Sequence, residues 1–366
     1  RSGVYFSLLT LASSQIAFEI AYRWNTVTGG ENGLQNVPRP LFASSLSFHI
    51  FASILVCAVV WCIWQLVHAP FGRSLQAIRD NEQRALSIGI DASRHRLVAF
   101  TISGAVIGLA GALNTFMLRG ADANSLRWEH AGDALLMSVL GGVHHFLGAL
   151  WGAIAFILLQ DALSTVTENW WLLFAPIIII SVLFFPEGLH GLIARGKRWT
   201  LIHDRLPARP AKPPALASRE VGISGRTVLS VVGLSKRFGS LVVADKLSVD
   251  VAAHTLHSFI GPNGAGKTTF FNMLSGALPA DSGTISFNGK DISRLPQHLR
   301  ARLGISRSFQ IVSIFNNLTA FENVRVVVQQ TRKQTGYWRD ALADDAINAQ
   351  TWATLDAFGL AEYAQV

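Results

Sequence analysis

The chain has 366 residues, enough for two or three domains. Half of the residues are hydrophobic and only 15% are charged, which is too apolar for a chain that is soluble throughout. The formal net charge is +8, but many of the arginines and lysines flank apolar runs, as they do in membrane proteins. We therefore exclude a wholly soluble enzyme and interpret the charge as membrane topology, not as a nucleic-acid surface. The two cysteines, Cys57 and Cys62, share one apolar run and are predicted to be packing residues without a disulfide.

The first half of the chain, residues 1–193, carries nearly all of the apolar runs. About 20 apolar residues span the hydrocarbon core of a bilayer, and a series of such runs with arginines at their ends is not typical of buried core helices. The predicted spans are 4–18 continuing to residue 23, 46–67, 97–118, 134–160 and 169–186.

The distribution of basic residues predicts the orientation of these spans. The loop 69–96 contains five arginines, and basic residues also follow Pro186, so both stretches are expected in the cytoplasm. Residues 24–40 are expected to form a turn-rich outer loop. An even number of crossings must then separate the two cytoplasmic stretches, but three apolar runs lie between them, at 97–118, 134–160 and 169–186. We therefore predict that 134–160 forms two shorter pieces, bent near His144 and His145.

Two pairs of glycines follow the G-x-x-x-G spacing within the apolar runs. They are Gly104 with Gly108, and Gly148 with Gly152. This spacing lets membrane helices approach closely, although glycine is also abundant in such helices without that role.

Residues 72–91 are predicted to form a short amphipathic helix that ends at Gly89. Leu75, Ile78, Ala85 and Ile88 line one side of it, with charged residues opposite. Such a helix could lie on lipid headgroups or dock into a groove of a partner ATPase, and the pattern itself favours neither.

The stretch 194–226 is predicted to be a linker. Four prolines lie between residues 205 and 214, so this part cannot be a helix or a central strand and is expected to be an extended tether.

The second half contains a phosphate-binding motif, G-x-x-x-x-G-K-[ST], at residues 261–268. Glycines let the loop aim its N–H groups inward, the following helix adds partial positive charge, the lysine reaches phosphates and the threonine hydroxyl suits Mg²⁺. We expect 259–260 to end a buried strand and 269–274 to begin a helix. The predicted ATP-binding residues of the motif are Gly261, Pro262, Asn263, Gly264, Ala265, Gly266, Lys267, Thr268 and Thr269.

Further elements surround this motif. Strands are predicted at 228–232, 247–251 and 284–287, the last followed by an Asn288-Gly289 hairpin turn. A strand is also predicted at 304–310, ending in Gln310. Thr319 and Glu322 have the spacing of a helix-capping box.

Motifs at 5–12, 28–34, 72–91, 140–152 and 183–189 follow one another in an order that resembles a permease subunit of the bacterial branched-chain amino acid ABC importers. The resemblance covers about the whole of 1–193. It implies that 75–91 is the coupling helix that contacts the ATPase, although Gln83 and Arg84 are more polar than the family pattern. The residues carried over to this role are Leu75, Ile78, Glu82, Ala85 and Gly89.

Residues 227–366 resemble an ABC ATPase. The resemblance implies that Phe238, expected on a loop, stacks on adenine, and that Gln310 senses Mg²⁺ and the attacking water. No Leu-Ser-Gly-Gly-Gln signature and no apolar run ending in Asp-Glu follow Gln310. We therefore expect both ends to be truncated and these residues alone not to hydrolyse ATP.

The predicted fold is a helical transmembrane permease at 1–193, a linker at 194–226 and a P-loop α/β ATPase domain at 227–366. The predicted function is that of a fused component of an inner-membrane importer for branched-chain amino acids, with ATP and Mg²⁺. The expected partners are a second permease subunit, a second ATP-binding subunit, a periplasmic binding protein and lipid, without nucleic acid. The alternatives are an importer of urea or short amides, an ABC exporter, and a membrane-tethered regulatory ATPase.

Overall fold

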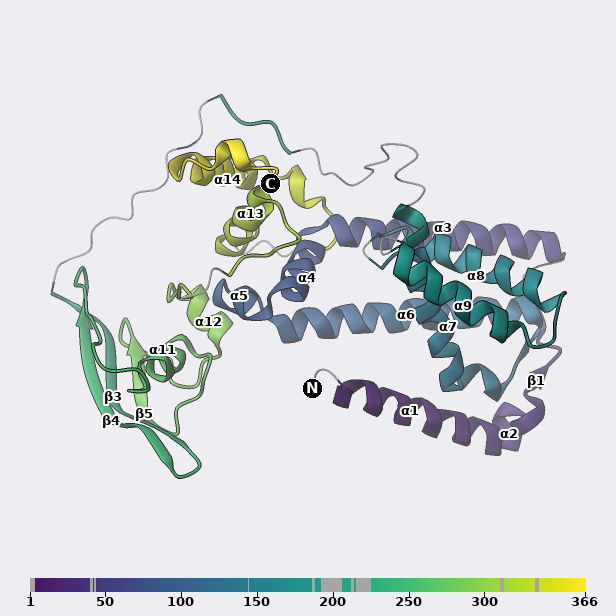
Figure 1. The fold of residues 1–366 in the computed structure, drawn as a ribbon, viewed down its shortest axis with the longest axis horizontal. Coiled ribbons are helices and arrows are strands. Elements are labelled where there is room, and N and C mark those ends of the chain that lie inside the picture. The colour runs from purple at the N-terminus through teal and green to yellow at the C-terminus, as the bar shows by residue number, and fades with distance from the viewer. Residues whose placement is uncertain are drawn as a thin grey trace. The chain divides into compact units, whose positions relative to one another are not determined.

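The computed structural model describes residues 4–39, 42, 44–143, 145–185, 188–191, 206–211, 214, 225–309, 313–332 and 336–366. They divide into two compact units. The first unit comprises Arg1–Val60 and Gly104–Arg205, and the second comprises Trp61–Ser103 and Leu206–Val366. The first unit is almost entirely helical, whereas the second combines helices with an antiparallel sheet (Figure 1).

Within the described residues, three helices are long and apolar enough to cross a membrane. They are α1 (Val4–Arg23), α3 (Ser45–His68) and α6 (Ala92–Leu118). The predictions of helices at 4–18, 46–67 and 97–118 are confirmed. Most of their large apolar side chains are exposed, as is expected of helices whose apolar surface faces lipid or other helices.

The run at 134–160 forms two helices, α7 (Trp128–Gly141) and α8 (Gly148–Ser164). The predicted break is confirmed between Gly141 and Gly148, whereas His144 lies outside the described residues. Helix α9 (Trp170–Phe184) follows, and α7, α8 and α9 share an apolar core. The buried residues of that core are Leu140, Phe156, Phe174 and Ile178.

Helices α7 and α8 approach each other at their glycines. A Cβ atom built on Gly152 would lie 1.8 Å from the Met137 carbonyl oxygen, and one on Gly148 would lie 2.1 Å from that of Gly142. The predicted close approach at this pair is therefore confirmed. By contrast, no described atom lies within 4 Å of a Cβ built on Gly104 or Gly108.

Short elements fill the segment that was predicted to be an outer loop. These are α2 (Asn25–Thr28), η1 (Gly30–Asn32) and β1 (Leu34–Gln35). Strand β1 pairs antiparallel with β2 (Gly120–Ala121), which η2 (Ala123–Leu126) follows.

In the second unit, residues 72–91 do not form the single helix that was predicted. Two helices, α4 (Pro70–Asp80) and α5 (Glu82–Ser87), meet at Asn81. The Asn81 side chain accepts a hydrogen bond from the Arg84 backbone N–H at 2.9 Å, so it caps α5. An asparagine that caps a helix in this way takes extended backbone angles, which end the preceding helix.

The sheet of this unit has the order β4-β3-β5-β6, with every neighbouring pair antiparallel. The strands are β3 (Thr227–Phe238), β4 (Leu241–Ala252), β5 (Ser282–Phe287) and β6 (Lys290–Asp291). The strands predicted at 228–232, 247–251 and 284–287 are confirmed. Asn288 and Gly289 have φ values of 51° and 78°, as a hairpin turn of this kind requires.

Helix α11 (Lys267–Ser275) packs against this sheet through Phe270 and Met273. It is followed by further short helices. These are α12 (Gln297–Arg302), α13 (Ala320–Thr331), η3 (Ala341–Ala343), α14 (Asp345–Ala357) and η4 (Ala361–Tyr363). Arg300 is 2% exposed and joins α11 to α12, since its guanidinium group donates to the carbonyl oxygen of Met273 at 2.6 Å.

Residues 206–211 of the linker form no helix or strand and are bound to α14. The Trp352 indole N–H donates to the Pro207 carbonyl oxygen at 3.1 Å, and Arg209 pairs with Asp356 at 2.5 Å.

Two predicted strands are wrong. Residues 255–260 form no strand, and Ile260 is 96% exposed. Residues 305–309 form none either. A strand depends on backbone hydrogen bonds to a neighbouring strand, and no described strand pairs with either segment.

Candidate nucleotide site and coupling contact

The P-loop turns into α11 at a left-handed glycine. Gly266, the residue before the helix, has a φ of 81°, and Gly264 has a φ of 87°. A Cβ atom at Gly266 would also lie 2.7 Å from the Val243 carbonyl oxygen on β4. Only glycine satisfies both the backbone angle and the close approach at this position. The predicted helix at 269–274 is confirmed, and its first residue is Lys267.

The Lys267 side chain folds back over its own loop. Its ammonium group donates to the carbonyl oxygens of Gly261 at 2.5 Å and Pro262 at 2.7 Å. A phosphate bound by the loop would compete with these neutral carbonyls for the same cation. The charge of Lys267 is thus held at the mouth of the loop, next to the N-terminus of α11.

A cavity of about 800 Å³ opens beside the N-terminus of α11. The described residues that line it include Lys267 and Arg307 but no aspartate or glutamate, together with hydroxyls from Thr268, Ser306 and Ser308. Two cations and several hydroxyl donors suit the phosphate groups of a nucleotide, and the Thr268 hydroxyl suits a phosphate-bound Mg²⁺. The site therefore fits the predicted cofactors.

Arg307 was not among the predicted site residues. Its guanidinium group lies 5.6 Å from the centre of the Phe309 ring and donates a hydrogen bond to the Asn272 side chain on α11. The sequence feature that could have indicated Arg307 is its position between two serines in the segment that leads to Gln310. Gln310 itself lies outside the described residues, so its predicted role stays a prediction.

Phe238 is the last residue of β3, not a loop residue as was predicted, and it is 49% exposed. The Lys236 ammonium group lies 5.6 Å from the centre of its ring and pairs with Asp281 at 2.6 Å. Hydrogen bonds from Lys236 and from the Arg237 backbone lower the pKa of Asp281. Phe238 does not line the cavity that contains Lys267, so the structure does not bring these two predicted residues together.

The second candidate site lies where α4 and α5 contact the segment 313–331. Ile78 and Ala85 are almost fully buried in one apolar cluster with Phe315, Leu318 and Val326. Leu75 packs against the same cluster. The apolar side predicted for this stretch is thus a protein contact within the second unit.

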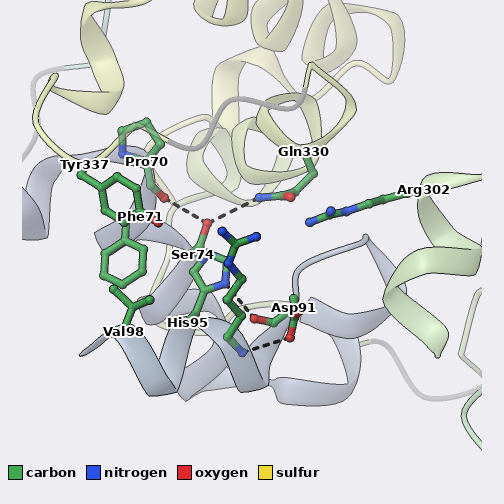
Figure 2. Close-up of a pocket in the computed structure, with 10 residues that line it drawn as sticks. Pro70, Phe71, Ser74, Asp91, His95, Val98, Arg302, Gln330 and Tyr337 are labelled. Carbon is green, nitrogen blue, oxygen red and sulfur yellow. Dashed lines mark hydrogen bonds between the residues drawn. The ribbon is translucent and has the colours of Figure 1, made fainter. Parts of the chain in front are cut away.

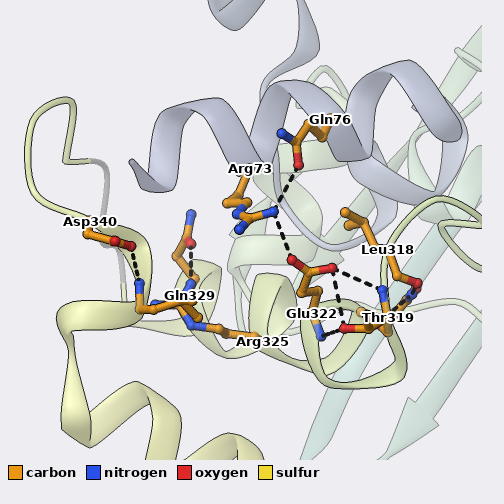
Figure 3. Close-up of polar contacts among 10 residues, drawn as sticks. Arg73, Gln76, Leu318, Thr319, Glu322, Arg325, Gln329 and Asp340 are labelled. Atoms are coloured by element: carbon orange, nitrogen blue, oxygen red, sulfur yellow. Dashed lines mark hydrogen bonds and ion pairs between the residues drawn. The ribbon is translucent and has the colours of Figure 1, made fainter. Parts of the chain in front are cut away.

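Polar contacts surround this cluster. Arg73 pairs with Glu322 at 2.8 Å (Figure 3). The Asp80 carboxylate accepts from the Asn317 side chain at 2.8 Å, and the Asn81 side chain donates to Ser313 at 2.8 Å. Glu82 faces outward and pairs with Arg96, while the Gly89 carbonyl oxygen accepts from Arg302 at 2.9 Å.

Glu322 has two roles in this contact. One carboxylate oxygen pairs with Arg73, and the other accepts the Thr319 backbone N–H at 3.0 Å in the predicted capping box, which is confirmed. Nearby, Arg325 is 2% exposed, and burial, followed by the charge of Arg73, lowers its pKa to about 10.

Two family models match this chain. Residues 3–183 match the branched-chain amino acid transport system permease component, and residues 244–365 match the ABC transporter family. The chain is an ABC transporter protein with a permease region followed by an ATPase region.

Curated relatives match the ATPase region. The high-affinity branched-chain amino acid transport ATP-binding protein LivG of Escherichia coli K12 is 37% identical over 145 residues, which is 37% of this chain and 56% of that protein. The corresponding BraF protein of Pseudomonas aeruginosa is 42% identical over 112 residues, 31% of this chain and 44% of that protein. The chain thus spans about half the length of the curated relatives it matches.

A solved nucleotide-free ATP-binding cassette from an ABC transporter is 25% identical, with a TM-score of 0.33. The match covers 38% of this chain and 56% of that one.

With these assignments, α4 and α5 belong to the permease region and α13 to the ATPase region. The predicted coupling residues Leu75, Ile78 and Ala85 are brought together against the ATPase region, whereas Glu82 is exposed and pairs with Arg96 of the permease region. Arg73 was missed because the resemblance assigned the coupling role to 75–91, whereas the helix begins earlier in the structure, at Pro70.

Proposed function

We propose that this chain is the combined permease and ATP-binding component of an ATP-driven importer for branched-chain amino acids in a bacterial inner membrane. The observation that carries the proposal is the burial of α4 and α5 against the 313–331 segment of the ATPase region. A cytoplasmic permease loop fixed to an ATPase region is the mechanical link that nucleotide-driven transport requires. The names of the relatives support branched-chain amino acids as the cargo.

In this proposal the loop 261–269 holds the phosphates of ATP, with Lys267 on the outer phosphates and Thr268 on Mg²⁺. Phe238 would stack on adenine and Gln310 would orient the attacking water. ATP supplies the free energy when bound. The residues of the chain bind and orient it, and the positive end of α11 lowers the electrostatic cost of the phosphate charge.

The coupling step runs through α13. Two ATPase regions are proposed to close on two nucleotides, and each nucleotide site is completed by residues of the other ATPase region. Because α13 is tied to α4 by a shielded ion pair and an apolar cluster, its movement would be passed to α3 and α6, the spans that flank α4 and α5. Alternating access of the spans would follow.

The proposed assembly contains a second permease subunit, a second ATP-binding subunit and a periplasmic binding protein. The proposed domains are 1–193 for the multi-pass permease, 194–226 for the linker and 227–366 for the cytoplasmic ATPase.

The test is uptake of labelled leucine and labelled urea by cells that express the intact transporter with its binding protein. We expect leucine uptake to depend on the binding protein and to be abolished by Lys267→Ala. Urea uptake in place of leucine would contradict the cargo, and ATP-dependent efflux without a binding protein would contradict import. Lys290→Ala, which changes an exposed lysine of the same region outside the nucleotide cavity, is the matched control.

A further inference from the structure

A second, smaller cavity of about 250 Å³ lies at the joint between the permease and ATPase regions, within one compact unit (Figure 2). Its walls come from the start of α4, the start of α6, the end of α12 and the end of α13. None of the described residues that line it also lines the nucleotide cavity. It is therefore a separate candidate binding site.

One wall of this cavity is cationic. Arg94 and Arg302 line it, and Asp91 is the acidic residue among the described lining. The Asp91 carboxylate already accepts the Arg94 backbone N–H at 3.0 Å and lies 3.6 Å from His298 Nε2. Among the described residues, no carboxylate pairs with the guanidinium group of Arg94 or Arg302. Positive charge is thus left available to an anion.

The rest of the lining provides polar groups, with Gln330 donating to the Ser74 hydroxyl at 3.5 Å, and an apolar wall. Figure 2 shows Arg302 extending toward Ser74 and Gln330 from the opposite side. The Phe71 ring lies 5.0 Å from that of Tyr337, centre to centre, and these two rings form the apolar wall. The ligand should therefore have an anionic head and an apolar body.

We propose that this cavity binds a small carboxylate with an apolar tail. Its volume is below the 300–1,000 Å³ or so of sites for drug-sized molecules, so the ligand must be small. The carboxylate would bind Arg94 and Arg302, and the tail would pack on Phe71 and Tyr337. Such a ligand touches both regions, so it stabilises the joint by binding the docked state more tightly than the separated one. This regulatory site is separate from the nucleotide cavity.

The test uses the full chain, purified and reconstituted in lipid nanodiscs. Equilibrium binding of radiolabelled 4-methyl-2-oxopentanoate and of leucine is measured, with 4-methylpentan-1-ol and inorganic phosphate as competitors. Arg94→Gln should weaken binding of the carboxylate about tenfold or more, because it removes a charge-assisted hydrogen bond. Arg294→Gln, an exposed arginine of the ATPase region that does not line the cavity, should leave binding unchanged.

Leucine and the oxo acid share the carboxylate and the tail, so a loss of binding of either in Arg94→Gln supports the proposal. Tighter binding of leucine than of the oxo acid would mean that the leucine ammonium group interacts with Asp91. Tighter binding of the oxo acid would mean that the amino group contributes nothing to the affinity. Arg94→Lys, which keeps the charge, should retain most of the affinity. The proposal is wrong if neither carboxylate binds at millimolar concentration, if Arg94→Gln binds as well as wild type, or if the alcohol or phosphate competes equally.

Discussion

The Arg73 guanidinium group lies 2.8 Å from the Glu322 carboxylate, and these side chains are only 10% and 13% exposed. One residue belongs to the permease region and the other caps the first turn of α13 in the ATPase region. Removing the charge of one partner in a shielded pair takes that compensation from the other charge, which costs more than the pair itself contributes.

Glu322→Gln separates the two roles of this residue. Glutamine can still accept the Thr319 N–H in the capping box, but it cannot neutralise Arg73. We expect the contact between α4 and α13 to weaken by about 3 kcal/mol. Hydrogen exchange of the α4 amides should therefore accelerate while the exchange of α13 amides changes little.

The matched control is Glu82→Gln, which removes an ion pair with Arg96 whose side chains are 44% and 48% exposed. That change should cost about 1 kcal/mol or less. The double variant Arg73→Met/Glu322→Gln should recover part of the α4 protection, because no charge is then left unpaired. Equal exchange rates in Glu322→Gln and Glu82→Gln would argue against an ion pair that holds the joint.

In the P-loop, Gly266→Ala should be more damaging than Gly264→Ala. Both positions have a left-handed φ, which costs an alanine about 1–2 kcal/mol. At Gly266 the new Cβ would also lie 2.7 Å from the Val243 carbonyl oxygen, whereas no described atom lies within 4 Å of a Cβ at Gly264. Binding of a fluorescent ATP analogue, together with thermal unfolding of each variant, measures the difference. Indistinguishable melting temperatures would mean that the close approach to β4 is not rigid.

In the permease region, Gly152→Ala should separate α7 from α8, because its Cβ would lie 1.8 Å from the Met137 carbonyl oxygen. Gly104→Ala places the same methyl group on α6 where no described atom lies within 4 Å. Thermal stability of the purified chain in detergent should fall for Gly152→Ala only. A comparable loss for Gly104→Ala would show that α6 has a close partner in the assembly.

We expect His298 to make the stability of the second unit depend on pH. Burial lowers the pKa of its imidazole from the ordinary value, an effect that Asp91 opposes and Arg302 supports. The unfolded chain therefore takes up the proton at a higher pH than the folded one, so stability falls as the pH drops below about 6.5. His298→Gln should flatten the stability profile of the second unit between pH 7.5 and 5.5. If the stability of His298→Gln fell as steeply with pH as that of the wild type, the pH dependence would come from another titratable group.

Local patterns predicted much of this molecule correctly. The capping box of Thr319 and Glu322, the Asn288-Gly289 turn and the helix that begins at Lys267 each depend on a few consecutive residues. The break between α7 and α8 followed from a count of crossings and basic loops. The errors at 259–260 and 304–309 have one cause, because an apolar stretch becomes a strand only where another strand bonds to its backbone.

The site predictions divide in the same way. Lys267 and Thr268 were found from the spacing of one motif, and both line the nucleotide cavity. Arg307 and Arg73 were missed, because their contacts with the Asn272 side chain and with Glu322 join segments that lie far apart in the sequence.

The sequence alone determined the phosphate-binding loop, the apolar helices and the helix caps, because these depend on residues that are neighbours along the chain. Only the tertiary structure decided that Arg73 meets Glu322, that Asn81 meets Ser313, and that two arginines share a small cavity with two aromatic rings. Ion pairs and cavities depend on which surfaces pack together, and that choice is made by the burial of whole helix faces, not by any one stretch of the chain.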